Sequence, residues 1–409
     1  MRFLLLTRVA EALRNCARYR IGQGGGRIRR RLLSAWLVSV ALTCGILVSA
    51  QAAVASGDAA NGGKITIAKL SNRTSAVGDA AVLTIKATDS VKGARLQYTV
   101  GNAPPGLDNV IGATYHGWLR QAGTFDVTVV VSDGDPQTEV SAGFVWTVRS
   151  AGTAGPTGPL RLDLGNRCLG AGAGVQLWQC NGSKGQRWTF VQDGSIRATG
   201  KCLTETGTQN NAPVTLKPCV GTPAQRWGLS HVPGKGVYSP GPVLVNEESG
   251  NCLNDPASSV RDGTKPNMWT CKGGKNQLWA GPAGPVQSQV PGMCLAIQSK
   301  ANAIVLAKCA DSAGQRWTLP PDGTIRIAGK CLFVERTTHL PYALQLRQCG
   351  GEAAESWLYW SGDGLNGNAI GNQMGFPGVY LETTGGTAQG TPVRAGEYSG
   401  AVTQFWRPL

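Results

Sequence analysis

The chain has 409 residues, 15% of them charged, and it contains 57 Gly and 12 Cys. This length indicates two to four domains, and the composition favours a β-rich protein with many turns over a helix bundle. The formal net charge of +15 falls to +7 without residues 1–31, which carry +8, and no basic run follows them, so nucleic acid is not an expected partner.

The first 52 residues have the pattern of a secretory signal peptide with a long basic leader. Nine Arg and one acid precede an uncharged apolar run over 32–50, and small residues then place cleavage near Ala52 or Ala55. An uncleaved anchor helix is the alternative, because the run is near the lower limit for spanning a bilayer. The stretch Arg29–Leu33 weakly resembles a twin-arginine signal, but disulfides suit general export in the unfolded state better. We therefore expect a secreted, extracellular protein.

Residues 53–63 form a Gly/Ala/Ser tether, and the pattern over 64–149 is typical of β-strands. Apolar residues alternate over 82–88 and 124–131, and Gly, Pro, Asn and Asp mark the turns between such runs. A segment of this length with several short strands fits a β-sandwich. It contains no Cys, so we expect no central disulfide.

The segment 64–149 resembles bacterial Ig-like, cadherin-like modules of secreted proteins. The resemblance is carried by Ala87-Thr88-Asp89-Ser90, Leu96-Gln97-Tyr98, Pro104-Pro105-Gly106-Leu107, Ala122-Gly123-Thr124-Phe125 and Trp146-Thr147-Val148. It implies an Ig-like β-sandwich that acts as a spacer or makes weak contacts. Asp89, Asp133 and Asp135 could hold calcium as in cadherins, but Asp is common in turns, and a turn-forming role is the favoured interpretation.

A Gly/Pro/Thr/Ala linker over 150–159 leads to a pattern that occurs six times. Each copy ends in a Gln-x-Trp-like tripeptide, and the copies recur every 38 to 52 residues. The motif residues are Gln186 and Trp188, Gln225 and Trp227, Gln277 and Trp279, Gln315 and Trp317, Glu355 and Trp357, and Gln404 and Trp406. A second break over 281–285 divides the copies into three over 160–281 and three over 282–409.

Ten Cys remain after cleavage of the leader, and all lie inside the repeats. An even Cys count in an exported chain implies disulfides. The sixth copy lacks both of its cysteines together and has Tyr380 and Tyr398 in their places, which is expected of a lost bridge. We predict the pairs Cys168–Cys180, Cys202–Cys219, Cys252–Cys271, Cys294–Cys309 and Cys331–Cys349. The chain has no Cys-x2-Cys spacing of the kind that binds zinc, and we expect neither a metal nor a cofactor.

One copy of about 40 residues is too short to bury its own apolar face, but three copies can close a six-stranded barrel capped by hairpins. We predict that each motif Trp lies in the shared core and that each motif Gln bonds hairpin backbone. The predicted fold class is therefore all-β, an Ig-like β-sandwich followed by two β-trefoils. The stretches 194–203 and 323–332, together with the six motifs, resemble the ricin B-chain lectin family.

That resemblance implies a sugar pocket made of four parts from one copy: an Asp, an aromatic ring, a Gln or similar residue, and an Asn. The third copy fits best, with Asn254 at the Asp place and Asp255 beside it, and with Asn267, Trp269 and Asn276 at the others. The first copy keeps Gln176 and Trp178 but has Gly170 and Gly185 at the remaining places. The other four copies have lost most of the set. Their substitutions include Thr204 and Lys217, Ala296 and Ala307, Phe333 and Arg347, and Glu382 and Gly396.

These features predict a secreted, non-catalytic, monomeric carbohydrate-binding protein whose partners are glycans or polysaccharide. The alternative is a cell-envelope scaffold or protein-interaction module with vestigial sugar pockets and protein partners at the envelope. An enzyme is disfavoured, because the only three His lie in three different modules and no nucleophile–base constellation is present.

Overall fold

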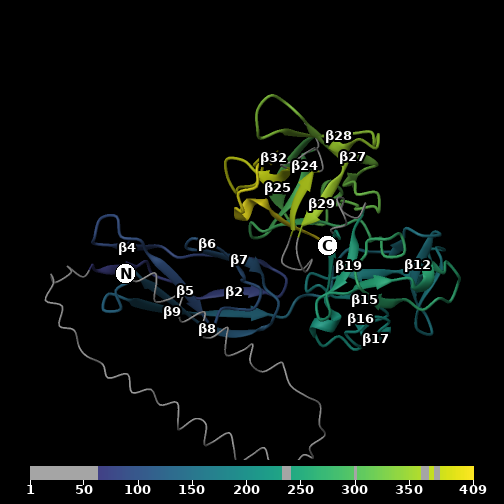
Figure 1. The fold of residues 1–409 in the computed structure, drawn as a ribbon, viewed down its shortest axis with the longest axis horizontal. Helices are drawn as coiled ribbons and strands as arrows, with labels where there is room; N and C mark the ends of the chain where they lie inside the picture. Colours follow the sequence, from purple (N-terminus) through teal and green to yellow (C-terminus); the bar gives the residue numbers. More distant parts are fainter. Residues whose placement is uncertain (1–62, 233–240, 299–301, 361–367, 373–377) are drawn as a thin grey trace, which may run out of the picture. The chain divides into compact units, whose positions relative to one another are not determined.

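The structure is a computed structural model that describes residues 63–232, 241–298, 302–360, 368–372 and 378–409. The signal peptide expected over 1–52 and nearly all of the tether lie outside these residues. Every regular element of the described chain is a β-strand or a single turn of 3-10 helix (Figure 1). The predicted all-β architecture is confirmed. None of the described helices is long and apolar enough to cross a bilayer.

Residues 64–149 form two main sheets around one apolar core. The strands are β1 (Ile65–Ile67), β2 (Arg73–Ala76), β3 (Ala80–Thr84), β4 (Ala87–Asp89), β5 (Gln97–Gly101), β6 (Asn109–Ile111), β7 (Thr114–Trp118), β8 (Gly123–Ser132) and β9 (Val140–Arg149). One sheet has the order β2-β9-β8-β5 and the other β3-β7-β6, while β1 pairs with β4. Leu83 of the second sheet and Val129 and Trp146 of the first lie in the same buried cluster.

The carboxylates of Asp89, Asp133 and Asp135 accept hydrogen bonds within turns of this segment. The Asp133 carboxylate accepts hydrogen bonds from the Asp135 amide at 3.0 Å and the Thr138 hydroxyl at 2.6 Å. The Asp89 carboxylate accepts one from the Val91 amide at 2.8 Å. Among the described residues, no group of three or more His, Cys, Asp or Glu side chains is placed to hold a metal ion.

Residues 157–280 form the first barrel of repeats. Its elements are β10 (Thr157–Gly158), β11 (Arg161–Leu162), β12 (Arg167–Ala171), β13 (Val175–Gln179), η1 (Lys184–Gln186), β14 (Trp188–Phe190), β15 (Ile196–Ala198), β16 (Lys201–Glu205), β17 (Val214–Lys217), η2 (Pro223–Gln225), β18 (Trp227–Ser230), β19 (Val243–Asn246), β20 (Cys252–Asn254), η3 (Pro256–Ser258), β21 (Asn267–Trp269) and β22 (Trp279–Ala280). The last strand of each copy pairs with the first strand of the next, as β14 does with β15 and β18 with β19. The barrel closes because β22 pairs with β11.

Residues 286–408 form the second barrel with the same plan. Its elements are β23 (Val286–Ser288), β24 (Met293–Gln298), β25 (Ala303–Lys308), η4 (Ala313–Gln315), β26 (Arg326–Ile327), β27 (Lys330–Glu335), β28 (Ala343–Arg347), η5 (Ala353–Glu355), β29 (Trp357–Trp360), β30 (Asn368–Asn372), β31 (Val379–Thr383), β32 (Val393–Gly396), η6 (Val402–Gln404) and β33 (Phe405–Pro408). Closure again joins the first and last strands, β23 and β33. Each barrel has its own apolar cluster, and Leu229 packs against both.

The six motif tryptophans lie in these cores. Trp227 is 5% exposed and the other five are fully buried. Each indole N–H donates to the carbonyl of the Leu that follows the first Cys place of the same copy. The six acceptors are Leu169, Leu203, Leu253, Leu295, Leu332 and Leu381, at 2.7 to 2.9 Å. A buried indole needs such a partner, so the tryptophan ties together the two ends of its own copy.

The motif Gln of each copy binds the turn that follows the second Cys place. In the third copy the Gln277 Oε1 accepts from the Lys272 amide at 2.7 Å, and its Nε2 donates to the Thr270 carbonyl at 3.1 Å. The same pair of contacts recurs in all copies but the fifth, where Glu355 only accepts, from the amides of Gly350 and Gly351. These side chains satisfy backbone groups that the hairpin turn would otherwise leave unpaired.

All five predicted disulfides are confirmed, with Cα–Cα distances of 5.0 to 5.1 Å. In the sixth copy the rings of Tyr380 and Tyr398 lie 5.1 Å apart and tilted by 55°. An aromatic contact therefore occupies the position that a disulfide has in the other five copies.

Candidate functional site

A cavity of about 360 Å³ opens in the third copy at the places where the sequence predicts a sugar pocket. Asn254 at the end of β20 and Asn267 and Trp269 on β21 line it, and Asn276 precedes the motif Gln. The two strands pair in antiparallel register, with Asn254 opposite Asn267 and Cys252 opposite Trp269. This register brings the predicted amides and the half-buried indole together around one space.

The amides of the pocket form one continuous chain of hydrogen bonds. Asn276 Nδ2 donates to Asn254 Oδ1 at 2.8 Å, and Asn254 Nδ2 donates to Asn267 Oδ1 at 2.8 Å. Asn267 Nδ2 then donates to Asn211 Oδ1 at 2.7 Å. Asn254 and Asn267 are almost fully buried, and each fixes the other's side chain. The chain of amides makes one wall of the cavity rigid.

Asn211 belongs to the second copy, in the turn before β17, and has a left-handed backbone with φ of 70°. Its backbone amide donates to the Met268 carbonyl of β21 at 2.7 Å, and the neighbouring Asn210 Oδ1 accepts from the Thr270 amide at 2.7 Å. The pocket is therefore built from two copies. The sequence of one copy carries no signal for Asn211, because the contribution of this residue depends on how the copies pack.

Asp255 does not line the cavity, contrary to its expected place among the sugar contacts. Its side chain is fully buried, and one carboxylate oxygen accepts a bond from the Val260 amide at 3.4 Å. Burial raises the pKa of this carboxyl. Its backbone serves the site instead, because the Asp255 carbonyl accepts from Asn276 Nδ2 at 3.2 Å and its amide donates to the Asn276 carbonyl at 2.9 Å.

The cavity is also lined by three further residues that the sequence did not single out. Pro256 and Ala257 form one rim, in a turn where Ala257 has φ of 57°. Lys272 lies on another side, in the turn held by Gln277, and is exposed. Lys272 follows the second Cys of its copy, and only the folded hairpin shows that its side chain reaches the pocket.

The first copy has an exposed indole without the same surroundings. Trp178 is 42% exposed and lies on β13 opposite Cys168 of β12. A Cβ at Gly170 would come within 3.1 Å of the Trp178 ring, so the indole lies over the place that the resemblance assigns to an Asp. Gln176 pairs with Gly170 across the same hairpin.

In the fifth and sixth copies, side chains of other types stand at the places that the resemblance assigns to the sugar contacts. The Arg347 guanidinium lies 4.0 Å from the ring centre of Phe333 and pairs with Glu335 at 2.7 Å. In the sixth copy the Glu382 carboxylate occupies the space in which a side chain at Gly396 would sit. Burial raises the pKa of Glu382, although the hydrogen bond from Gln404 acts in the opposite direction.

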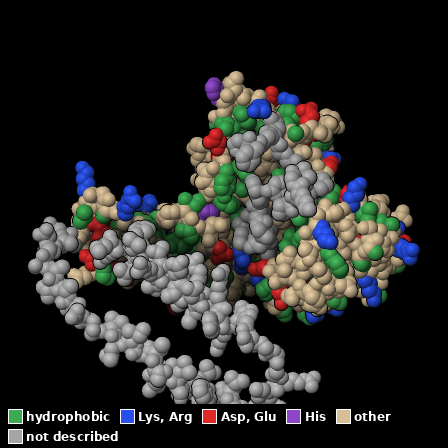
Figure 2. All heavy atoms as spheres, in the orientation of Figure 1, with side chains coloured by type: hydrophobic (Ala, Val, Ile, Leu, Met, Phe, Trp, Pro, Cys, Tyr) green, Lys and Arg blue, Asp and Glu red, His purple; other side chains and the backbone are tan. Residues whose placement is uncertain are grey.

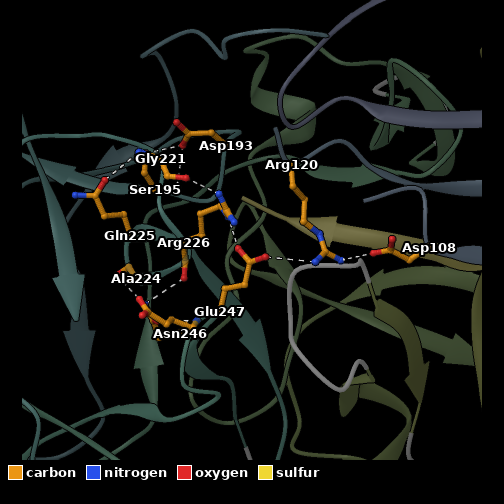
Figure 3. Close-up of polar contacts among 11 residues, drawn as sticks. Asp108, Arg120, Asp193, Ser195, Gly221, Ala224, Gln225, Arg226, Asn246 and Glu247 are labelled. Carbon is orange, nitrogen blue, oxygen red and sulfur yellow. Dashed lines mark hydrogen bonds and ion pairs between the residues drawn. The ribbon is translucent and has the colours of Figure 1, made fainter. Parts of the chain in front are cut away.

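A second polar cluster lies where the segment 64–149 meets the first barrel, beside a cavity of about 650 Å³. Arg120 pairs with Asp108 of its own segment at 2.8 Å and reaches Glu247 of the barrel at 3.3 Å (Figure 3). Glu247 also pairs with Arg226, while Asn246 donates to the Ala224 carbonyl at 3.0 Å. The cations drawn here face carboxylates, so the cluster joins two parts of the chain electrostatically.

The closed barrels with threefold repetition define a β-trefoil, and an aromatic, amide-lined pocket on a hairpin is a lectin-like feature of that class. Residues 157–241 and 282–374 match the family model of the ricin-type beta-trefoil lectin domain. These two stretches are therefore similar to ricin-type β-trefoil lectin domains. The third copy, with its pocket, lies between the two matched stretches.

Known proteins that the chain resembles include lectins and ribosome-inactivating proteins. Volkensin from Adenia volkensii is 30% identical over 194 residues, which are 45% of this chain and 35% of volkensin. The beta-galactoside-specific lectin 2 of Viscum album is 26% identical over 276 residues, 64% of this chain and 45% of that protein. The chain thus matches less than half the length of these relatives. The solved agglutinin from Abrus precatorius is 21% identical, with 63% of this chain and 98% of that one covered and a TM-score of 0.29.

Proposed function

We propose that the protein is a secreted, non-catalytic glycan-binding protein whose main pocket is the one around Trp269. The observation that carries the proposal is the pairing of a partly exposed indole with a hydrogen-bonded chain of amides in one cavity of about 360 Å³. Sugars present an apolar C–H face beside polar hydroxyls, and a ring with fixed amides matches both. The lectin-domain match and the galactoside lectin among the relatives support the same class of ligand.

Several features support the remaining parts of the proposal. Five disulfides within one chain are typical of an oxidising, extracellular compartment, which suits the signal peptide expected over 1–52. On the face that Figure 2 shows, the described Lys and Arg side chains are scattered among acidic ones, an arrangement that does not favour nucleic acid. We propose that the segment 64–149 is an Ig-like spacer, because it has two sheets and the sequence motifs of such modules.

A scaffold or protein-contact role is the second candidate, and the second trefoil favours it. There Arg347 stacks on Phe333 at the edge of a cavity of about 420 Å³, and Glu382 fills the space at Gly396, so neither copy keeps the set of sugar contacts. We propose this role for the second trefoil alongside glycan binding by the first. Crosslinking on intact cells tests it: recovery of polysaccharide alone, without any protein, would count against the scaffold.

The test of glycan binding compares two tryptophan variants on a glycan array and on insoluble polysaccharides. Trp269→Ala removes the indole of the pocket, and Trp178→Ala removes an exposed indole from the first copy. We expect loss of binding in the first variant and retention in the second. Absence of binding by the native protein, or binding that Trp269→Ala leaves unchanged, would overturn the proposal.

A further inference from the structure

The amide chain of the third-copy pocket has a fixed direction. The Asp255 carbonyl has no hydrogen to give, so the Asn276 atom that faces it, at 3.2 Å, is the donor Nδ2. The same Nδ2 donates to Asn254, whose oxygen therefore points toward Asn276 and whose Nδ2 points toward Asn267. One backbone carbonyl thus sets the orientation of every amide as far as Asn211.

With the amides in this orientation, some of their N–H groups at the cavity are not used within the chain of hydrogen bonds. An Asn Nδ2 carries two N–H groups. Asn254 and Asn267 each use one for the next amide of the chain, and Asn211, at its end, only accepts. The spare groups are thus mainly N–H donors, in residues that line the cavity. The motif Gln277 binds the turn through its oxygen and through one N–H of its Nε2, so any group that it adds at the cavity is again a donor.

A positive charge stands beside these donors. The Lys272 side chain lines the cavity, and among the described residues its ammonium forms no ion pair. The carboxylates nearest in sequence to the rim are engaged elsewhere. Asp262 pairs with Arg167 at 2.7 Å, and Asp255 is buried beneath the rim with its carboxylate toward the Val260 amide. None of the described Asp and Glu side chains lines this cavity.

We infer that the third-copy pocket selects glycans that carry an anionic group, the carboxylate of a uronic acid or a sulfate ester. The apolar face of the sugar lies on Trp269, and the anionic group lies among Lys272 and the spare amide N–H groups. Such a group has only acceptors, which matches a wall of donors and a cation. A carboxylate at the place of Asn254 would repel it. The inference rests on the proposed function and specifies its ligand class.

The test uses ligands that differ only in charge. Oligogalacturonate and its fully methyl-esterified form share one sugar backbone, and a sulfated galactan and its desulfated form make a second pair. Binding of the purified full chain is measured by calorimetry at low and at physiological ionic strength. We expect the anionic member to bind about tenfold tighter at low salt, with a smaller difference at higher salt. The pair with the larger difference distinguishes carboxylate from sulfate.

Two lysine variants separate the pocket from general charge. Lys272→Gln and Lys275→Gln remove the same charge from the same turn, but only Lys272 lines the cavity. We expect Lys272→Gln to abolish the preference for the anionic ligand and Lys275→Gln to retain it. Asn254→Asp should reverse the preference toward the neutral ligand, because it places a carboxylate in the wall.

The outcomes also separate the inference from the proposed function. Equal binding of charged and neutral ligands, lost in Trp269→Ala, would overturn the inference and leave glycan binding intact. An equal loss of preference in both lysine variants would show a diffuse charge effect and would also overturn it. If none of these ligands binds at millimolar concentration, the inference fails, and the proposed function fails with it only if the glycan array and the insoluble polysaccharides show no binding either.

Discussion

The Gln-x-Trp motif acts through two side chains that bind backbone groups of their own copy. The indole N–H reaches the Leu carbonyl after the first Cys place, and the Gln amide holds the turn after the second. The indole contact recurs in all six copies and the full pair of Gln contacts in five, although the surface residues between them vary from copy to copy. The motif is therefore a requirement of folding, and it persists in copies whose pockets have been filled or lost.

Glu355→Gln is expected to stabilise the second trefoil. Glu355 is buried and accepts bonds from Gly350 and Gly351, but a carboxylate lacks the N–H with which the other five copies bind the carbonyl before the second Cys place. A Gln would restore that bond, worth about 1 kcal/mol, and would remove a buried charge. Unfolding in denaturant, followed by tryptophan fluorescence, measures the change.

The matched control for that prediction is Gln315→Glu in the fourth copy. It removes the bond from Gln315 Nε2 to the Lys308 carbonyl, 2.8 Å long, and should destabilise the same trefoil. The explanation is wrong if Glu355→Gln destabilises the protein as much as Gln315→Glu does.

At the scale of elements, the pocket depends on a loop that another copy holds in place. The 255–262 loop contains three non-glycine residues with left-handed backbones, Ala257, Ser258 and Val260. Such conformations cost energy, so they persist only where contacts with the surrounding structure hold the backbone in place. Arg167 of the first copy donates to the Val260 carbonyl at 2.8 Å and pairs with Asp262. Pro256 and Ala257, at the start of this loop, form the rim of the cavity.

Arg167→Ala is therefore expected to weaken glycan binding although Arg167 does not line the pocket. Releasing the 255–262 loop adds an ordering cost to binding, and we expect an affinity loss of about three- to tenfold. Calorimetry with the glycan identified for the native protein gives the affinity, and hydrogen exchange over residues 255–264 reports the loop. Arg316→Ala, which removes an exposed ion pair with Asp311 in the second trefoil, is the control. Faster exchange without any loss of affinity would contradict the prediction.

The sequence predicted what each copy contains and missed what the copies share. Repeat spacing and the paired loss of Cys led to the five disulfides, all of which the structure has. The resemblance to the ricin B-chain family singled out Asn254, Asn267, Trp269 and Asn276, and the structure brings them to one cavity. Asn211 comes from a neighbouring copy, and Asp255 is turned inward by the strained 255–262 loop. Both depend on packing between copies, which a one-copy pattern does not contain.

At the scale of the whole molecule, buried polar residues join the three β-rich parts of the described chain. Arg407, near the end of β33, donates to the Gly78 carbonyl at 2.7 Å, and its guanidinium lies 5.5 Å from the centre of the Trp118 ring. Burial lowers its pKa to about 9. His116 of β7 bonds Gln289 at 2.7 Å through its Nδ1. Hydrogen bonds of this kind link residues of the segment 64–149 to residues of the second barrel.

His231 makes the junction between the two trefoils sensitive to acid. Its Nδ1 accepts from the Tyr359 amide at 3.1 Å, and its ring stacks on Tyr359 with centres 4.9 Å apart. Burial lowers the pKa of His231 from 6.5 to about 3. The docked state therefore holds the neutral ring, while an opened junction would let it protonate below pH 6.5. Stability of the junction is complete above pH 6.5 and falls as the pH drops from there toward 3, by about 1.4 kcal/mol per unit.

His231→Gln should remove that dependence, because a Gln oxygen can accept the Tyr359 amide and does not titrate. Hydrogen exchange of residues 357–359, corrected for the intrinsic rate, measures the opening at pH 7 and pH 5. We expect the native protein to lose about 2 kcal/mol of protection between these values and the variant to lose much less. Glu205 and Asp255, whose pKa values burial raises, favour the folded state in acid, so the difference between native protein and variant at each pH isolates His231. His339→Gln, at an exposed position, is the control; protection that falls equally in native protein and His231→Gln would assign the acid response to other groups.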